Sequence, residues 1–170
     1  MIRLATPADA AALAELAAET FPLACPPGNT AESIRHFIDT HLSEAHFASY
    51  LADPTRAILV ADDFAGYTML IFEEPHDSDV AASVTKHPTV ELSKCYVRAA
   101  DHGAGTAARL MLATIELARS RGAAGVWLGV NELNARANSF YAKHGFEQVG
   151  TKKFLLGDHW EDDFVRELAL

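Results

Sequence analysis

Apolar residues recur along the chain with two different periods, and these separate the expected helices from the expected strands. Three helices are expected in the first third: an Ala- and Leu-rich one that follows Thr6-Pro7 and ends at Thr20, one from about Thr30, and one that begins at Ser43. Hydroxyl-bearing N-cap residues and a proline in the first turn are typical of helix starts. Phe21–Gly28 contains three prolines and a glycine, so a loop is expected there.

Short apolar runs dominate the rest of the chain. Strands are expected at the following segments: Ile2–Ala5, Ala57–Ala61, Phe64–Phe72, Val90–Val97, Gly125–Val130, Phe146–Leu156 and Phe164–Leu170. Gly105–Arg121 and Leu133–His144 are expected helices, and the polar segment His76–Pro88 is expected to be an exposed loop. The order β-α-α-α-β-β-β-α-β-α-β-β predicts one α+β domain over residues 1–170, in which helices flank a mixed, mostly antiparallel seven-stranded sheet.

Composition narrows the class of protein. The 170 residues are 49% hydrophobic and 22% charged, and no apolar run reaches the roughly 18–20 residues of a membrane span. The two cysteines and eight histidines show no metal-ligand spacing, so no metal is expected. Because the N-terminus shows no signal-peptide pattern, a cytoplasmic protein is expected. The net charge of −9 argues against nucleic acid as a partner and is compatible with a cationic ligand.

The segment from Val97 to Ala107 carries the first functional motif. Gly103 and Gly105 stand between the end of a strand and the start of a long helix. The free N–H groups of a helix N-terminus bind anions, and glycines let a diphosphate approach the backbone without meeting a Cβ atom. The segment lacks the Lys-Ser/Thr of a P-loop and the third glycine of the dinucleotide fingerprint. By itself, the motif fits a simple tight turn equally well.

A second motif lies on the helix after the Gly125–Val130 strand, namely Asn134-x-x-Ala137-x-x-Phe140-Tyr141-x-Lys143-x-Gly145-Phe146. Together with His102-x-x-Gly105-x-Ala107 and the strand Glu91-Leu92-x-x-x-Tyr96-Val97, it resembles the GNAT N-acetyltransferase superfamily. The resemblance covers Val90–Phe146 specifically and, through the order of elements, the whole chain. It departs from the family pattern at His102, where Arg or Gln is usual. It implies the GNAT acyltransferase fold and an enzyme that transfers acetyl from acetyl-CoA, its co-substrate, to a primary amine.

The resemblance also implies roles for individual residues. The backbone of Cys95, Tyr96 and Val97 would pair with the pantetheine arm and stabilise the oxyanion, and a bulge in this strand would open the slot that the arm needs. Tyr141 would protonate the leaving thiolate as general acid. The CoA diphosphate would lie on the turn formed by His102, Gly103, Ala104, Gly105, Thr106 and Ala107. Further cofactor contacts are expected from Asn134, Ala137, Tyr141 and Lys143.

Simpler interpretations of these residues stay open. Tyr141 also fits a core aromatic, Asn134 a helix N-cap, and Lys143 a solvated side chain. Neither Cys25 nor Cys95 has a sequence partner that marks an activated nucleophile, so direct transfer in a ternary complex is expected.

The attacking amine must first lose a proton, because an alkylammonium has a pKa near ~10. Glu91 stands where many members of the resembled family place a suitable acid, and it is the catalytic base expected here. A surface carboxylate at a strand end is the alternative interpretation. Glu73 and Glu74, at the end of the preceding strand, are the next candidates.

Shorter matches resemble the PaiA-type polyamine N-acetyltransferase branch. They are Glu19-Thr20-Phe21, Asn29-Thr30-x-Glu32 and Phe154-x-Leu156-Gly157-Asp158-x-x-x-Asp162. They imply a spermidine- or spermine-like acceptor. Four carboxylates are expected in the turn of the final hairpin, where they would attract a polycation or merely form a solvated acidic turn; they are Asp158, Glu161, Asp162 and Asp163.

The acceptor is the most open part of the interpretation. Glu73, Asp158 and Trp160 are the candidate substrate-binding residues, and an exposed Trp160 would pack over the acceptor or over a partner subunit in a homodimer. A different amine, such as a protein N-terminus, an amino acid or an antibiotic, is the nearest alternative. A non-catalytic CoA-sensing module on the same fold is an alternative of another class.

Overall fold

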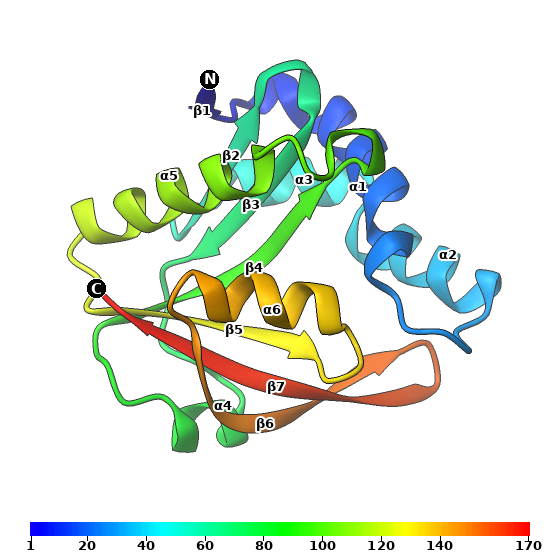
Figure 1. Cartoon of the computed structure of the whole chain (residues 1–170). Coiled ribbons are helices and arrows are strands. Elements are labelled where there is room, and N and C mark those ends of the chain that lie inside the picture. The colour runs from blue at the N-terminus through cyan, green and yellow to red at the C-terminus, as the bar shows by residue number, and fades with distance from the viewer.

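The computed structural model describes all 170 residues and places seven strands in one sheet, in the order β1-β2-β3-β4-β5-β7-β6. The strands are β1 (Ile2–Leu4), β2 (Arg56–Ala61), β3 (Gly66–Ile71), β4 (Thr89–Val97), β5 (Gly125–Asn131), β6 (Glu147–Leu156) and β7 (His159–Ala169). Only β4 and β5 run parallel, and every other neighbouring pair is antiparallel. The predicted mixed, mostly antiparallel α+β sheet is therefore confirmed (Figure 1).

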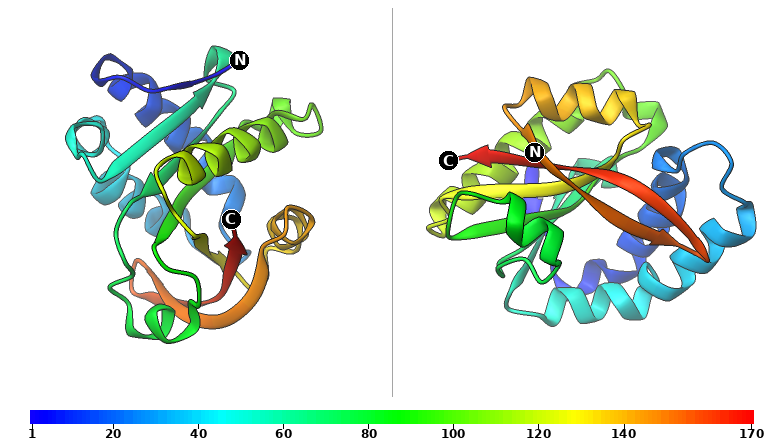
Figure 2. Two further views of the ribbon diagram at one scale, coloured as in Figure 1. Left: turned by 90° about the vertical axis from the view of Figure 1, so that its left-hand side faces the viewer. Right: turned by 90° about the horizontal axis from the view of Figure 1, so that it is seen from below.

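Helices cover both faces of this sheet (Figures 1 and 2). They are α1 (Ala10–Ala24), α2 (Ala31–His41), α3 (Glu44–Ala52), α4 (Ser78–Ser83), α5 (Thr106–Ser120) and α6 (Ala135–Lys143). Alternate residues of β3 point to opposite faces, as the pleat requires. Tyr67 and Met69 pack in the core formed with α1, α2 and α3. Thr68 hydrogen-bonds Thr114 of α5, and Leu70 packs in the core under α5 and α6.

The expected loop at Phe21–Gly28 is wrong in its first half, because α1 continues through Pro22 to Ala24. A proline inside a helix removes one hydrogen bond and is normally unfavourable. Phe21 explains the extension: it is only 6% exposed and stacks on Phe37 of α2, with ring centroids 4.5 Å apart. Burial of this ring favours helix beyond the point where local propensity alone would end it.

The expected exposed loop at His76–Pro88 is also wrong, since it contains α4. The Asp77 carboxylate accepts hydrogen bonds from the N–H groups of Asp79 and Val80 and so caps this helix. Val80 and Val84 are buried against Trp127 and Val165. Two apolar residues in a polar segment were too weak a periodic signal to predict the helix.

The final hairpin is tighter than expected. The second strand was predicted from Phe164, but β7 begins at His159, so the turn is only Gly157-Asp158. Glu161, Asp162 and Asp163 therefore lie in β7 and not in the turn. Two of the three carboxylates face lysines across the hairpin, with Lys152 opposite Asp163 and Lys153 opposite Asp162, whereas Glu161 lies opposite Phe154. Cross-strand pairs of opposite charge stabilise a strand whose polar sequence does not predict one. The first helix was predicted to begin at Pro7, but Pro7–Asp9 form a 3₁₀ turn and α1 begins at Ala10. The remaining element boundaries agree with the prediction to within two residues.

Glu167 of β7 fixes the segment that leads from α4 into β4. Its carboxylate accepts hydrogen bonds from the Thr85 N–H at 2.9 Å, the Lys86 N–H at 3.0 Å and the Thr85 hydroxyl at 2.7 Å. Burial opposes ionisation of Glu167, but these hydrogen bonds outweigh it and lower its pKa. The segment is thus tied to the opposite half of the sheet.

We expect Glu167→Gln to lower the free energy of unfolding by about 1–3 kcal/mol at neutral pH, because buried donors lose a charged acceptor. Urea denaturation measures this. Since folding lowers the pKa of Glu167, its contribution is present above the ordinary glutamate pKa and is lost as pH falls through the folded value. The difference in the free energy of unfolding between wild type and variant should therefore become smaller at acidic pH. Glu147→Gln, at the exposed position opposite Glu167 on β6, is the control, and equal destabilisation by both changes would contradict the assignment.

Candidate active site

A slot opens at the centre of the sheet, between β4 and β5. The two strands pair only over Thr89–Glu91 and Gly125–Trp127 and then diverge (Figure 1). Beyond Glu91, β4 pairs with β3 alone, and beyond Trp127, β5 pairs with β7 alone. The edge of β4 that faces β5 therefore carries backbone groups without a strand partner.

A bulge in β4 accompanies this divergence. Met69 of β3 lies opposite Lys94, whereas Leu70 lies opposite Leu92, so Ser93 is an extra residue in β4. Such a bulge bends its strand and increases the local twist. The bulge that the resemblance called for is therefore present, two residues before Cys95.

A cavity of about 260 Å³ lies at the slot. Six of the predicted site residues line it: Glu91, Cys95, Tyr96, Asn134, Ala137 and Tyr141. Its other walls come from α1, α2 and the strands β4 to β7, and they include Cys25, Phe37, Lys94, Trp127, Lys152, Glu161 and Asp163. We call it the acceptor cavity.

A second cavity of about 150 Å³ adjoins the first. The two share the following residues: Ala24, Cys95, Tyr96, Asn134, Ala137 and Tyr141. The second cavity adds Val97, His102 and Ala107, together with Arg136 and Phe140 of α6. Predicted residues from three separate segments thus gather around one continuous site, whose second part we call the cofactor cavity.

The turn before α5 has the geometry of an anion site. Gly103 and Gly105 have φ of +84° and +83°, a region that residues with a side chain rarely adopt. The N–H groups of Gly103, Gly105, Thr106 and Ala107 make no hydrogen bond to any backbone carbonyl. These donors and the dipole of the 15-residue helix α5 favour a phosphate at this point.

His102 does not point away from this turn but links it to α6. Its Nδ1 lies 2.6 Å from a guanidinium nitrogen of Arg136, and its Nε2 lies 2.9 Å from the Val97 carbonyl oxygen. Because a guanidinium only donates, Nδ1 is the acceptor, and Nε2–H donates to Val97. Arg136, which sequence reasoning missed, therefore places a positive charge beside His102, the position where the family usually has Arg or Gln. Its position just before Ala137 in the second motif was the available signal.

Tyr141 extends from α6 to the junction of the two cavities. Burial raises its pKa well above 10, and the nearby Cys95 thiol raises it further. Burial also raises the pKa of Cys95 to about 12. Both groups are therefore protonated at neutral pH: Tyr141 is a phenol that can give up a proton, and Cys95 is a thiol.

The remaining predicted cofactor residues lie in different surroundings. Asn134 is the N-cap of α6, where its side-chain oxygen accepts a hydrogen bond from the Ala137 N–H at 3.1 Å, and it lines both cavities as well. Ala104 is exposed in the turn, and Thr106 is buried at the start of α5. Lys143 is exposed in the last turn of α6 and lines neither cavity.

The acceptor cavity contains charges of both signs. Burial raises the pKa of Glu91, against the opposing effect of Lys152 and Lys94. Burial lowers the pKa of Lys94 to about 8 and raises that of Asp163 to about 6. Sequence reasoning did not select Lys94 or Lys152, although a lysine inside a predicted strand was a visible signal.

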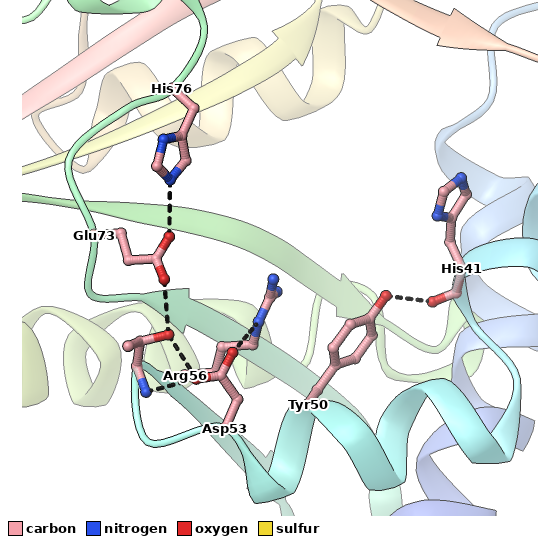
Figure 3. Close-up of polar contacts among 7 residues, drawn as sticks. His41, Tyr50, Asp53, Arg56, Glu73 and His76 are labelled. Atoms are coloured by element: carbon pink, nitrogen blue, oxygen red, sulfur yellow. Dashed lines mark hydrogen bonds and ion pairs between the residues drawn. The ribbon is translucent and has the colours of Figure 1, made fainter.

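Glu73 and Glu74 lie outside both cavities. Glu73 accepts a hydrogen bond from the Thr55 hydroxyl at 3.2 Å and contacts His76 at 3.0 Å, in a polar network beside Asp53 (Figure 3). Glu74 contacts Nδ1 of His87 at 2.8 Å. Both carboxylates thus have partners on the surface.

The tip of the final hairpin also lies apart from the cavities. Asp158 is exposed in the turn, and Trp160 is 61% exposed in β7, opposite Leu155 of β6. Neither lines the acceptor cavity. No cluster of three or more His, Cys, Asp or Glu side chains is arranged to hold a metal ion, and no helix is both long and apolar enough to cross a membrane.

Comparison with known proteins agrees with this geometry. An N-acetyltransferase of Mycobacterium tuberculosis, itself described as uncharacterized, is 49% identical over 166 residues, which cover 95% of this chain and 99% of that protein. The PaiA N-acetyltransferase of Thermoplasma acidophilum, solved with coenzyme A, is 19% identical, with a TM-score of 0.79 over 100% of this chain and 98% of that one. An acetyltransferase of Salmonella typhimurium solved with acetyl-CoA is 24% identical, with a TM-score of 0.67 over 100% of this chain and 93% of that chain.

The sequence profile of the Acetyltransferase (GNAT) family matches residues 10–146, which include the slot, the glycine turn and Tyr141. The free amides of the turn and the cavity beside β4 fit a cofactor with a diphosphate and a thioester arm. The chain therefore belongs to the GNAT acetyltransferase family and is an acetyl-CoA-dependent N-acetyltransferase.

Proposed function

We propose that the protein acetylates a primary amine by direct attack of the amine on acetyl-CoA, with both substrates bound together. One observation carries the proposal: Glu91 and Tyr141, a carboxylate and a phenol, line the same cavity at the open edge of β4. A carboxylate can take the proton that the amine must lose, and a phenol can supply the proton that the leaving thiolate needs.

The cofactor would lie across the two features built from backbone. The diphosphate would meet the free amides of the turn around Gly103 and Gly105, with Arg136 close by. The pantetheine arm would follow the unpaired edge of β4 toward Cys95, in the place that β5 vacates. There a backbone N–H could also stabilise the negative charge that develops on the acetyl oxygen.

The proton path follows from the two pKa shifts. Glu91 takes a proton from the ammonium, and the neutral nitrogen bonds to the acetyl carbon as the carbon–sulfur bond breaks. Tyr141, kept protonated by burial, gives its proton to the departing sulfur. The second proton of the attacking nitrogen then restores the Tyr141 phenol, so that a neutral amide and the CoA thiol are formed, and Glu91 releases its proton to water. Burial raises the pKa of Glu91 and so brings it closer to neutral pH, where a carboxylate is a more effective base.

An acetyl-cysteine route fits the site poorly. Burial holds Cys95 as a thiol with a pKa of about 12, and no histidine lines the acceptor cavity to accept its proton. Burial raises the pKa of Cys25 to about 11. Because the thiolate is the nucleophile, both cysteines are poorly suited to attack.

The polyamine acceptor and the homodimer stay predictions. The likeness to the PaiA enzyme of Thermoplasma acidophilum and the carboxylates of Glu91, Glu161 and Asp163 support a cationic acceptor. Asp158 and Trp160, the other candidate contacts, lie outside the cavity. The exposed pair Leu155 and Trp160 on the β6–β7 hairpin supports a subunit contact at that tip.

The proposed reaction predicts release of CoA thiol from acetyl-CoA in the presence of a suitable amine. A panel of polyamines, diamines, amino acids, aminoglycosides and peptides would be tested at fixed acetyl-CoA. Direct transfer predicts intersecting initial-velocity lines when both substrates are varied, whereas an acetyl-enzyme predicts parallel ones. Tight acetyl-CoA binding without turnover of any amine would favour the CoA-sensing alternative.

Tyr141→Phe should lower kcat by about 10²–10⁴-fold, because the leaving thiolate loses its proton donor. The ring is retained, so the dissociation constant for acetyl-CoA, measured by calorimetry, should stay unchanged. A variant with wild-type kcat would show that Tyr141 is only a core aromatic.

In the wild type, kcat/KM should decrease at low pH, and we call this decrease the acidic limb of the pH profile. Glu91→Gln should remove the acidic limb. The base acts only when ionised, so activity is present above the raised pKa of Glu91 and falls as pH drops through it. The wild-type limb should therefore lie above the ordinary glutamate pKa of about 4.3. Glu73→Gln and Glu74→Gln, which change carboxylates outside the cavities, are the matched controls. Loss of the limb in either control would place the base elsewhere.

A further inference from the structure

The acceptor cavity holds two opposite charges that have no partner within the chain. Glu91 and Lys94 line it, and neither makes a hydrogen bond or an ion pair to another residue. Lys94 lies near the ring of Tyr50, with Nζ 5.7 Å from the ring centroid, while Tyr50 itself donates to the His41 carbonyl (Figure 3). Glu91 and Lys94 are both half-buried and influence each other through space, but they form no ion pair. Charges partly withdrawn from water are normally paired, so this arrangement requires an explanation.

The bulge at Ser93 places these two side chains on the same face of the sheet. In a regular strand, residues three apart point to opposite faces. Here Glu91 lies opposite Ile71 and Lys94 opposite Met69, two positions apart on β3, so both point to one face. The irregularity that opens the slot thus also turns a lysine toward the acceptor.

The other charges of the cavity already have partners. Glu161 accepts hydrogen bonds from the amides of Asn29 at 3.3 Å and Asn131 at 3.2 Å. Asp163 and Lys152 face each other at 3.8 Å. Of the charged residues that line the cavity, only Glu91 and Lys94 have no hydrogen bond or ion pair, and these two carry opposite charges.

The size of the cavity limits the ligand. About 260 Å³ is at or below the usual range of about 300–1,000 Å³ for sites that hold drug-sized molecules. The acetyl group of the cofactor must occupy part of it. An acceptor of amino-acid size suits this space, whereas a long polyamine would extend beyond the cavity.

We infer that the acceptor is a small amine that also carries a carboxylate, and that Lys94 binds this carboxylate while Glu91 receives the ammonium. The inference rests on the proposed function and names its substrate class. A zwitterion supplies an opposite charge to both Lys94 and Glu91 at once. A polyamine would instead place further positive charge beside Lys94 and Lys152.

Matched pairs of amines test the inference, because their members differ only in the carboxylate. β-Alanine would be compared with propan-1-amine, and 4-aminobutanoate with butan-1-amine, by kcat/KM from CoA release. We expect the carboxylate member of each pair to be favoured by about 10- to 100-fold, the ratio that corresponds to one charge-assisted hydrogen bond. Lys94→Gln should bring this ratio close to one, mainly through KM.

Lys153→Gln is the control, since it removes a lysine of β6 that is exposed and paired with Asp162. Lys153→Gln should leave the ratio of kcat/KM values within each pair of amines unchanged. Plain amines or polyamines that react as well as the carboxylate members, with a ratio that Lys94→Gln does not alter, would overturn the inference while the proposed function stands.

A binding measurement separates the two proposals when no amine turns over. N-acetyl-β-alanine and N-propylacetamide, the products of the first pair, would be titrated into the protein–CoA complex. Tighter binding of the carboxylate product, lost in Lys94→Gln, would uphold the carboxylate subsite even if the proposed reaction failed. Equal binding of the two products would overturn the subsite.

Discussion

The structure depends on one constraint: β4 must hydrogen-bond to β3 along its length and release β5 after three residues. The extra residue Ser93 is the local change that accompanies this release. A continuous sheet at this point would have satisfied the backbone of both strands and left no space between them. The unpaired edge of β4, both cavities and the access of Tyr141 to Cys95 follow from the missing pairing.

Backbone donors without protein partners lie beside the cofactor cavity. They occur at the start of α5, where Gly103 and Gly105 are exposed, and along the edge of β4 that β5 leaves free. Exposed N–H groups can bond water in the free protein, so retaining them costs less than retaining buried ones. In the proposed binding mode the backbone would supply most of the donors to the diphosphate. His102, which stands where the family usually has Arg or Gln, would then hold Arg136 beside the turn.

Sequence patterns predicted the parts of the fold whose formation depends on residues that are close together in the chain. The caps at Thr30 and Ser43, the glycine turn and the alternating strands depend on neighbours in sequence, and the sequence predicted them correctly. The helix at Ser78–Ser83 and the first half of β7 depend on distant partners. Val80 and Val84 needed Trp127, and the carboxylates of β7 needed the lysines of β6. No periodicity within either segment reveals those contacts.

The same distinction between local signals and distant contacts applies to the residues of the site. Residues that act through a motif, such as Gly105 and Tyr141, could be found by spacing alone. Lys94 could not, because strict alternation along β4 places it on the face opposite Glu91, and only the bulge reverses this. A lone lysine and a lone carboxylate beside the cavity weaken the fold of the free protein. Such a cost is typical of binding sites, where groups that a ligand will satisfy are held ready at the expense of stability.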